Sequence, residues 1–293
     1  MTRPKILLAG ANGQVGWELQ RTLSSLGEVV ALDAQGLNLA DAADVRAKLK
    51  TLMPDVIVNA AAYTAVDKAE SEADRAQAVN AIAPGVMAEE AANTGALLVH
   101  YSTDYVFDGS GSVPWREEDA CHPLNVYGRT KLEGESLIQR SGCRHLIFRT
   151  SWVYGARGSN FFLTMRRLMG ERSELKIVDD QIGAPTWCRD LAEATAQILS
   201  QLRPLRDKKN EVPWGVYHMC NAGETSWHGF AQAIQGMIPS EMCTLKQLIA
   251  IPSTEYSTPA QRPRNSRLDN TKLQETFGLR LQTWQSALRL CMA

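Results

Sequence analysis

The sequence predicts an α/β fold in which helices cover both faces of a parallel sheet and a smaller lobe follows. Short strands rich in Val, Ile and Leu alternate with amphipathic helical segments through the first half, as in parallel sheets. A glycine-rich turn directly follows the first strand. After about residue 152 the alternation loosens, so we expect residues 1–152 to form the larger domain. Residues 153–293 should form mainly the smaller lobe, partly interleaved with it.

The predicted elements can be read along the chain from their periodicity and their flanking turns. In the first half, strands are expected at 5–10, 28–33, 55–62, 96–102 and 145–151, and helices at 14–26, 42–52, about 74–93 and from about 127. In the second half, helices are expected at 160–171, 189–202, 226–238 and 283–292, and strands at 175–180 and 216–221. Residues 203–215 and 258–273 are expected to be loops, the second of them basic.

The composition is that of an ordinary globular protein, with 22% charged and 44% hydrophobic residues among 293. A net charge of -1 gives no general attraction to nucleic acid or to an anionic membrane. No apolar run reaches the roughly 18 residues that span a bilayer, and the short run after the N-terminus is interpreted as a strand. The six cysteines are scattered, which argues against a zinc site or a disulfide framework and favours a reducing compartment, the cytoplasm.

The turn "GANGQVG" places Gly10, Gly13 and Gly16 between the first strand and the first helix. Glycine allows the tight turn and a close approach to a ligand, and the helix N-terminus favours an anion. The spacing alone is weak and often marks only a turn. In this strand-turn-helix context it predicts dinucleotide binding and a Rossmann-like, doubly wound sheet, with Asn12, Gln14 and Val15 beside the glycines.

Asp33 ends the second predicted strand, about 20 residues after the turn. A carboxylate there can accept hydrogen bonds from the adenosine ribose and disfavours a 2′-phosphate. This indicates NADH over NADPH, with use of both left open, because Asp at a strand end is also a common turn residue. The alanines that follow the third strand leave room for a cofactor, but tight packing of a helix on the sheet explains them equally well.

Two further segments carry polar chemistry. Ser102, Thr103 and Asp104 end the fourth strand, where open α/β sheets bind ligands, although a polar strand end can also simply cap a loop. Tyr127 and Lys131 lie four residues apart on one helical face. A nearby ammonium, together with the positive charge of an oxidised nicotinamide, is expected to bring the phenol's pKa down towards the working range, so the pair predicts a proton donor to a carbonyl. Alone, the pair reads more readily as a surface Tyr with a solvated Lys.

The combination resembles the extended short-chain dehydrogenase/reductase superfamily, and within it the dTDP-4-dehydrorhamnose reductase family. The resemblance is carried by "GANGQVGWEL", "STDYVFDG", "NVYGRTKLEGE", "RTSWVYG" and "DQIGAPT", and it extends from residue 10 to about 269. It implies reduction of the 4-keto group of dTDP-4-dehydro-L-rhamnose by NADH or NADPH, a nucleotide sugar as the small-molecule partner, and no nucleic acid or membrane. A homodimer is also expected.

The resemblance also implies roles at matching positions. Tyr127 is the expected general acid, Lys131 its partner and the anchor of the nicotinamide ribose, and Thr103 the hydroxyl on the keto oxygen. Residues expected to bind the cofactor are Gly10, Asn12, Gly13, Gln14, Val15, Gly16, Asp33, Asn38, Leu39, Ala62, Tyr63 and Thr64, besides Tyr127 and Lys131. Residues expected to bind the substrate are Thr103, Asp104, Trp152, Arg262, Asn265 and Ser266; the last three could equally belong to a solvated loop.

The chain departs from the family pattern at two points. Asn38 stands where the superfamily often has an acidic residue, which weakens the predicted contact with the adenine. Mg²⁺ is often described for the family, but only Glu18 is a plausible ligand, and Trp187, Cys188 and Arg189 supply no acidic partner. Two alternatives remain open: a nucleotide-sugar epimerase of the same fold, and a non-catalytic subunit like the regulatory subunit of methionine adenosyltransferase.

Overall fold

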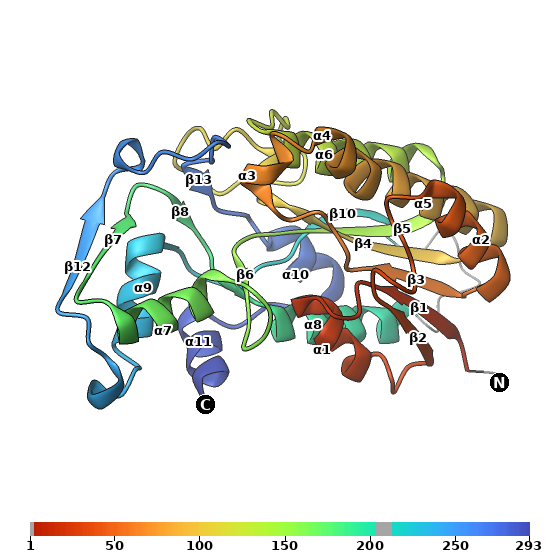
Figure 1. Cartoon of the computed structure of the whole chain (residues 1–293). Helices are drawn as coiled ribbons and strands as arrows, with labels where there is room; N and C mark the ends of the chain where they lie inside the picture. The colour runs from red at the N-terminus through yellow and green to blue at the C-terminus, as the bar shows by residue number, and fades with distance from the viewer. Residues whose placement is uncertain (1–2, 203–212) are drawn as a thin grey trace.

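The computed structural model describes residues 3–202 and 213–293, and it shows a large sheet-containing unit joined side by side to a smaller lobe (Figure 1). The loop expected at 203–215 lies almost entirely outside the described residues. Within the described part of the chain, no helix is long and apolar enough to cross a membrane.

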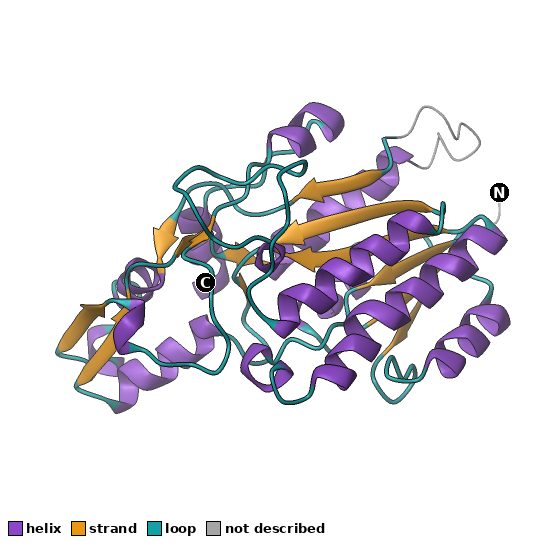
Figure 2. Ribbon diagram, turned by 90° about the horizontal axis from the view of Figure 1, so that it is seen from above, coloured by secondary structure: helices purple, strands orange, loops and turns teal. Residues whose placement is uncertain are grey.

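The large unit is built on a six-stranded parallel sheet in the order β10-β5-β4-β3-β1-β2. Its strands are β1 (Lys5–Ala9), β2 (Glu28–Leu32), β3 (Val56–Asn59), β4 (Leu97–Thr103), β5 (Arg144–Thr150) and β10 (Gly215–His218). β1 lies between β2 and β3, so the chain reverses its direction of winding there, and such a point opens a crevice at the carboxyl ends. These ends point towards the smaller lobe (Figure 2). The predicted doubly wound parallel sheet is confirmed.

Helices cover both faces of this sheet (Figure 1). One face packs against α1 (Gln14–Thr22), α8 (Cys188–Leu202) and α10 (Thr271–Phe277). The other face packs against α2 (Ala42–Leu52), α5 (Ala83–Thr94) and α6 (Val126–Arg140). Each group of helices encloses its own apolar core, which explains why the strands read as continuous apolar runs. Three elements of this unit, α8, β10 and α10, come from beyond residue 152, while the domain boundary itself stays a prediction.

The connection between β3 and α5 is helical but irregular. It contains α3 (Val66–Ala69), α4 (Ala73–Gln77) and a π-helical turn, η1 (Ala78–Ile82), that runs directly into α5. The single helix expected over about 74–93 is therefore present with a π-helical interruption. Such interruptions often occur at functional sites, and this one carries the buried Asn80.

The smaller lobe has its own aromatic core. Its helices are α7 (Phe161–Glu171), α9 (Trp227–Gln235) and α11 (Trp284–Met292). The lobe's longer strands are β7 (Glu174–Val178) and β12 (Gln247–Ile251), which pair in parallel. Its short strands are β6 (Val153–Tyr154), β8 (Ile182–Gly183), β9 (Thr186–Trp187), β11 (Thr225–Ser226) and β13 (Asn265–Ser266). Three-residue 3-10 turns lie at η2 (Asp104–Val106), η4 (Ser240–Met242) and η5 (Ser253–Glu255).

Two expectations for the C-terminal half were wrong. The segment 258–273 is not all loop, because β13 pairs with β8 and α10 begins at Thr271. Its basic and proline-rich composition hid the buried Leu273, which packs into the core under the sheet. Strand β12 was not expected, and its partner β7 lies in a distant part of the sequence.

Candidate active site

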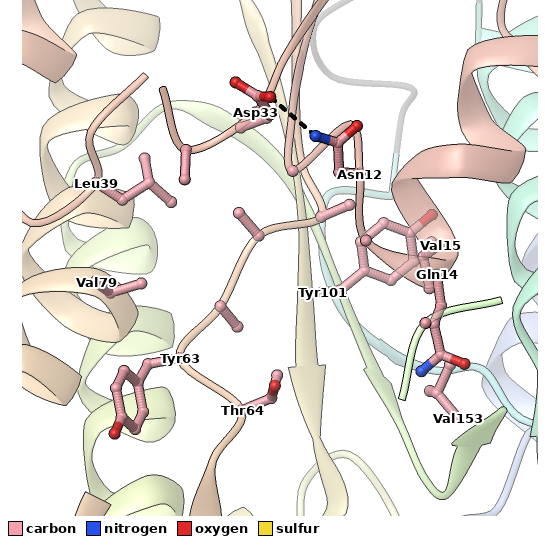
Figure 3. Close-up of a pocket in the computed structure, with 18 of the residues that line it drawn as sticks. Asn12, Gln14, Val15, Asp33, Leu39, Tyr63, Thr64, Val79, Tyr101 and Val153 are labelled. Atoms are coloured by element: carbon pink, nitrogen blue, oxygen red, sulfur yellow. Dashed lines mark hydrogen bonds between the residues drawn. The ribbon is translucent and has the colours of Figure 1, made fainter. Parts of the chain in front are cut away.

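A cavity of about 640 Å³ lies at the carboxyl ends of the parallel strands. Gln14, Val15 and Val153 stand on one side of it and Leu39, Val79 and Tyr63 on the other (Figure 3). Residues expected to bind the cofactor that line it are Gly10, Asn12, Gly13, Gln14, Val15, Asp33, Asn38, Leu39, Ala62, Tyr63, Thr64, Tyr127 and Lys131. The structure thus brings all members of that set except Gly16 together around one cavity.

Gly10 and Gly16 shape the turn that opens helix α1. Gly10 has φ +86°, a conformation that side chains disfavour, and a Cβ there would stand 2.8 Å from the Ala61 nitrogen. A Cβ on Gly16 would overlap the Gly10 carbonyl oxygen. Gly16 therefore allows the helix to pack closely on the turn and does not line the cavity. Helix α1 has no side-chain cap at Gly13, so its first N–H groups remain available to an anion.

Asp33, just beyond β2, is both a turn residue and a cavity residue. Its carboxylate accepts hydrogen bonds from the backbone N–H groups of Gln35 and Gly36, each at 3.0 Å. Asn12 donates to it from its side-chain amide at 2.8 Å (Figure 3). These hydrogen bonds lower the pKa of Asp33, the one from Gly36 most strongly. The carboxylate is therefore held ionised at the rim where a ribose hydroxyl would be recognised and a phosphate repelled.

Tyr127 is the second residue of helix α6, and Asn125 caps the start of that helix. Asn125 caps the helix by accepting from the Gly128 N–H at 2.8 Å, and its amide donates to the Gln261 carbonyl. The Tyr127 ring packs edge-on against Tyr105, with ring centroids 5.5 Å apart. The sequence "NVYGRTK" thus contains its own helix start, which directs the phenol to the strand ends.

The expected lowering of the Tyr127 pKa was wrong for the protein alone. Burial raises the pKa of Tyr127 to about 12, and a hydrogen bond with Thr103 only partly opposes the rise. A phenol with this pKa stays protonated at neutral pH, which is the form that donates a proton.

Lys131 is fully buried and holds two hydrogen bonds. Its Nζ lies 2.6 Å from the Tyr101 carbonyl oxygen and 3.0 Å from His100 Nε2. Burial lowers the pKa of Lys131 to about 8, against an opposing effect of Glu135. An ammonium has three N–H donors and the Tyr101 carbonyl accepts from one of them, so a donor remains for a ligand in the cavity that Lys131 lines.

Two buried hydroxyls in the cavity lack hydrogen-bond partners in the described part of the chain, which bears on whether the cavity suits a polar cofactor. Ser102 at the end of β4 and Thr150 at the end of β5 both line the cavity. Among the described residues, neither hydroxyl has a hydrogen-bond partner although both are buried. Buried polar groups in proteins are normally satisfied, so these hydroxyls fit a ligand that supplies polar atoms of its own. Together with the glycine turn and Asp33, they fit a dinucleotide.

Asp104 lies directly beyond β4 with its carboxylate buried. Thr103 donates to its Oδ1 at 3.0 Å, and Oδ2 has no hydrogen-bond partner within the described part of the chain. Burial raises the pKa of Asp104 to about 6, opposed by the hydroxyls of Ser266 and Thr103. The predicted substrate residue Ser266 therefore faces the predicted substrate residue Asp104 across the two units.

A second cavity, of about 750 Å³, lies in the smaller lobe. It is lined by Phe161, Thr164, Met165, Leu168, Arg172, Glu174, Leu175, Lys176, Ile177, Val178, Gln181, Trp227, Ile251, Glu255, Tyr256 and Arg262. Trp152 stacks on Trp227 with ring centroids 3.7 Å apart and, unusually for a residue other than glycine, has φ 48°. Arg262 pairs with Asp67 at 2.8 Å and faces Tyr105, which packs on Tyr127. These contacts link the second cavity to Tyr127, the expected general acid.

Asn265 lies apart from these groups. It is buried, and its amide donates to the carbonyl oxygens of Val113 at 2.8 Å and Ser110 at 3.4 Å. Its own carbonyl accepts from the Trp115 indole. Asn265 thus fastens the 110–115 loop to β13, and its predicted contact with substrate has no free side-chain donor to support it.

The described residues offer no ligand set for the Mg²⁺ that is often described for the family. Within residues 3–202 and 213–293, no group of three His, Cys, Asp or Glu side chains is placed to hold an ion. Glu18 lies 3.7 Å from Arg21, and Arg189 pairs with Glu193 at 2.9 Å. The carboxylates in this region therefore face guanidinium groups of their own chain.

Sequence reasoning missed three buried polar residues behind the cavity. Asn80, in the π-helical turn, accepts from the Tyr63 N–H at 2.8 Å and donates to the hydroxyl of Thr130 at 3.2 Å. Asn59 and His100 form a chain of contacts to Lys131. For His100 and Asn59, the available signal was a polar residue within or at the end of an apolar run, as in "LLVHYST" and "VIVN".

Comparison with known proteins agrees with this geometry. The family model described as RmlD substrate binding domain matches residues 4–293. A dTDP-4-dehydrorhamnose reductase of Burkholderia thailandensis is 48% identical over 293 residues, covering 98% of each chain. The crystal structure of a dTDP-4-dehydrorhamnose reductase from Clostridium acetobutylicum superposes with a TM-score of 0.88 at 38% identity, covering 98% of each chain. That of a Bacillus anthracis dTDP-4-dehydrorhamnose reductase in complex with NADP has a TM-score of 0.88 at 33% identity, covering 99% of each chain.

Proposed function

The chain belongs to the dTDP-4-dehydrorhamnose reductase family, and we propose that its two cavities bind NAD(P)H and a nucleotide sugar for reduction at Tyr127. The protein is an NAD(P)H-dependent oxidoreductase that reduces the 4-keto group of dTDP-4-dehydro-L-rhamnose in dTDP-rhamnose biosynthesis. The observation that carries the assignment of residues is the hydrogen bond between Tyr127 and Thr103. Tyr127 and the buried Lys131 line the same cavity as the glycine turn.

In the proposed reaction, the chain's residues protonate the former keto oxygen and stabilise the phenolate that is left. NAD(P)H, when bound, supplies the hydride for the 4-keto carbon. Tyr127 gives its phenolic proton to the former keto oxygen as that oxygen gains electrons, so an alkoxide does not accumulate. Thr103 exchanges its bond to Asp104 for one to the same oxygen and aligns it with the phenol. Lys131 in its charged form stabilises the phenolate that remains.

The substrate's two ends are assigned to different groups. Asp104, with a free carboxylate oxygen, accepts from a sugar hydroxyl next to the keto group. Trp152 forms the wall beside it. Arg262 lines the second cavity, where its guanidinium can bind the diphosphate bidentately. Its present partner Asp67 is half exposed to solvent, so the exchange of a carboxylate for a phosphate costs little.

Asp33 supports NADH as the preferred cofactor. Its ionised carboxylate would repel a 2′-phosphate, and its sequence neighbours "AQGLN" include no arginine to bind one. The Bacillus anthracis relative binds NADP, so use of both cofactors is included in the proposal.

Cytoplasmic residence and a homodimer complete the proposal. All six cysteines are free thiols, which suits a reducing compartment. The mass of the protein in solution tests the dimer.

A spectrophotometric assay of NADH and NADPH oxidation with dTDP-4-dehydro-L-rhamnose tests the proposed function. We expect stoichiometric oxidation of one or both cofactors. A nucleotide-sugar epimerase would convert its substrate without consuming added cofactor. A regulatory subunit would co-purify with a synthetase and show no turnover, and absence of turnover with either cofactor would overturn the proposal.

A further inference from the structure

A chain of three buried polar side chains stands behind the cavity. Asn59 at the end of β3, His100 in β4 and Lys131 in α6 are each no more than 1% exposed. Asn59 Nδ2 lies 3.1 Å from His100 Nδ1, and His100 Nε2 lies 3.0 Å from Lys131 Nζ. In so dry a place every donor must meet an acceptor, so the hydrogen positions along the chain depend on one another.

The direction of these hydrogen bonds follows from one backbone group. The Ala61 N–H can only donate, and it lies 3.2 Å from Asn59 Oδ1. The NH₂ group of Asn59 therefore faces His100 Nδ1, and an amide nitrogen can only donate. His100 Nδ1 must then be the nitrogen without a hydrogen. In a neutral imidazole the hydrogen is on the other nitrogen, Nε2, which points at Lys131.

An N–H at Nε2 distinguishes the two forms of Lys131. A neutral amine has a lone pair that accepts this hydrogen, whereas an ammonium has only donors. The Tyr101 carbonyl, 2.6 Å away, accepts from either form. His100 stays neutral, because burial and the charge of Lys131 keep its pKa well below the usual range. The arrangement therefore disfavours the ammonium beyond what burial does.

The other charged groups around Lys131 do not reverse this effect. Glu135 lies one turn further along α6 and raises the pKa of Lys131, but it forms a buried ion pair with Arg149 of β5 at 2.7 Å. Tyr127 on the same helix is a protonated phenol at neutral pH. Asp104, beyond β4, faces Tyr127.

We propose that Asn59 and His100 are positioning residues that set the charge of Lys131 by directing the His100 Nε2–H at its amine. The inference rests on the proposed function, in which charged Lys131 stabilises the Tyr127 phenolate. Reduction is then lost at alkaline pH as Lys131 loses its proton, and Asn59 and His100 move that limit to lower pH. Their direct contact is with Lys131, so they act on the reaction through it.

The hydrogen on His100 can be located in the unaltered protein. In ¹⁵N-labelled protein at neutral pH, the two ring nitrogens of His100 have different chemical shifts according to which one carries the hydrogen. We expect the Nε2–H form, and the Nδ1–H form or a doubly protonated ring would overturn the proposal.

Two substitutions should change the charge of Lys131 by different routes. In Asn59→Asp, one carboxylate oxygen accepts from Ala61 and the other from His100 Nδ1, so Nε2 becomes an acceptor for the ammonium. In His100→Gln, which adds no charge, the amide oxygen can face the ammonium. In protein labelled with ¹³C at lysine Cε, we expect the Lys131 titration midpoint to rise by about one pH unit or more in both. The Lys131 signal is identified by its absence in Lys131→Arg.

An unchanged or lower Lys131 titration midpoint in either variant would overturn the proposal. A rise in Asn59→Asp alone would not support it, because the added negative charge by itself raises the pKa of Lys131. The exposed Lys50 is an internal control and should not move. The alkaline limb of the pH–rate profile should shift upward together with the midpoint. Since the titration needs neither substrate nor turnover, failure to reduce the keto sugar would count against the proposed function alone.

Discussion

The hydroxyl of Thr103 donates a hydrogen bond to Oδ1 of its neighbour Asp104 at 3.0 Å, inside the protein. While this contact holds, the hydroxyl hydrogen of Thr103 is not available to a substrate. It becomes available when another donor replaces Thr103 at the Asp104 carboxylate. The nucleotide sugar carries hydroxyls that can serve as that donor. In the proposed reaction, binding of the sugar and release of Thr103 are therefore coupled through one carboxylate.

The buried carboxylate of Asp104 should make stability depend on pH. Burial raises its pKa from 3.8 to about 6, so the folded state binds this proton more tightly than the unfolded state does. Stability is then greatest below the unfolded pKa and falls as pH rises through about 6. Relative to Asp104→Asn, the wild type should lose about 2 kcal/mol of unfolding free energy between pH 4 and 7.

Urea denaturation of both proteins across that pH range measures the difference. The exposed Asp74→Asn is the control and should follow the wild type. A difference between wild type and Asp104→Asn that stays constant with pH would contradict the prediction.

Removal of the Tyr127 hydroxyl should separate chemistry from binding. Tyr127→Phe keeps the ring that packs on Tyr105, so fold and cofactor affinity should persist. Turnover should fall roughly 100-fold or more, because a general acid is lost. Tyr217→Phe removes a phenol beneath α10 and should retain turnover. Near-normal reduction of the keto sugar by Tyr127→Phe would refute the assignment of the acid.

Loss of the Arg262 guanidinium should weaken substrate binding selectively. Arg262→Met is expected to raise KM for the nucleotide sugar about tenfold or more, since a charge-assisted bond to phosphate is lost. KM for NADH should stay the same, because Arg262 lines the second cavity. The matched control is Arg264→Met, whose side chain is mostly exposed. Equal effects of the two substitutions would place the diphosphate elsewhere.

An added methyl group at Gly16 should disturb the cofactor turn. In Gly16→Ala, the Cβ would overlap the Gly10 carbonyl oxygen, and backbone atoms cannot move aside cheaply. Such overpacking typically costs about 1–3 kcal/mol. We expect a lower Tm and weaker NADH binding in a fluorescence titration. Gly236→Ala, where the nearest atom is 3.6 Å away, should change neither.

Much of the fold could be predicted because its signals are local. A strand buried on both faces must be apolar throughout, as in "KILLA" and "LLVHYST", and a helix must repeat its apolar face. The turn at Gly10 and the helix start at Asn125 are equally local. The second half was predicted less well, because β12 and β13 acquire their partners only from distant segments.

By itself, therefore, the sequence determined the doubly wound sheet, the glycine turn, the pairing of Tyr127 with Lys131 on one helical face and the family. Only the tertiary structure decided how these residues are protonated. Burial depends on the whole fold, and it raised the pKa of Tyr127 where spacing had suggested a lower one. The tertiary structure also decided that Arg262 pairs with Asp67 and that His100 contacts Lys131. Such contacts join distant segments that no local sequence pattern relates.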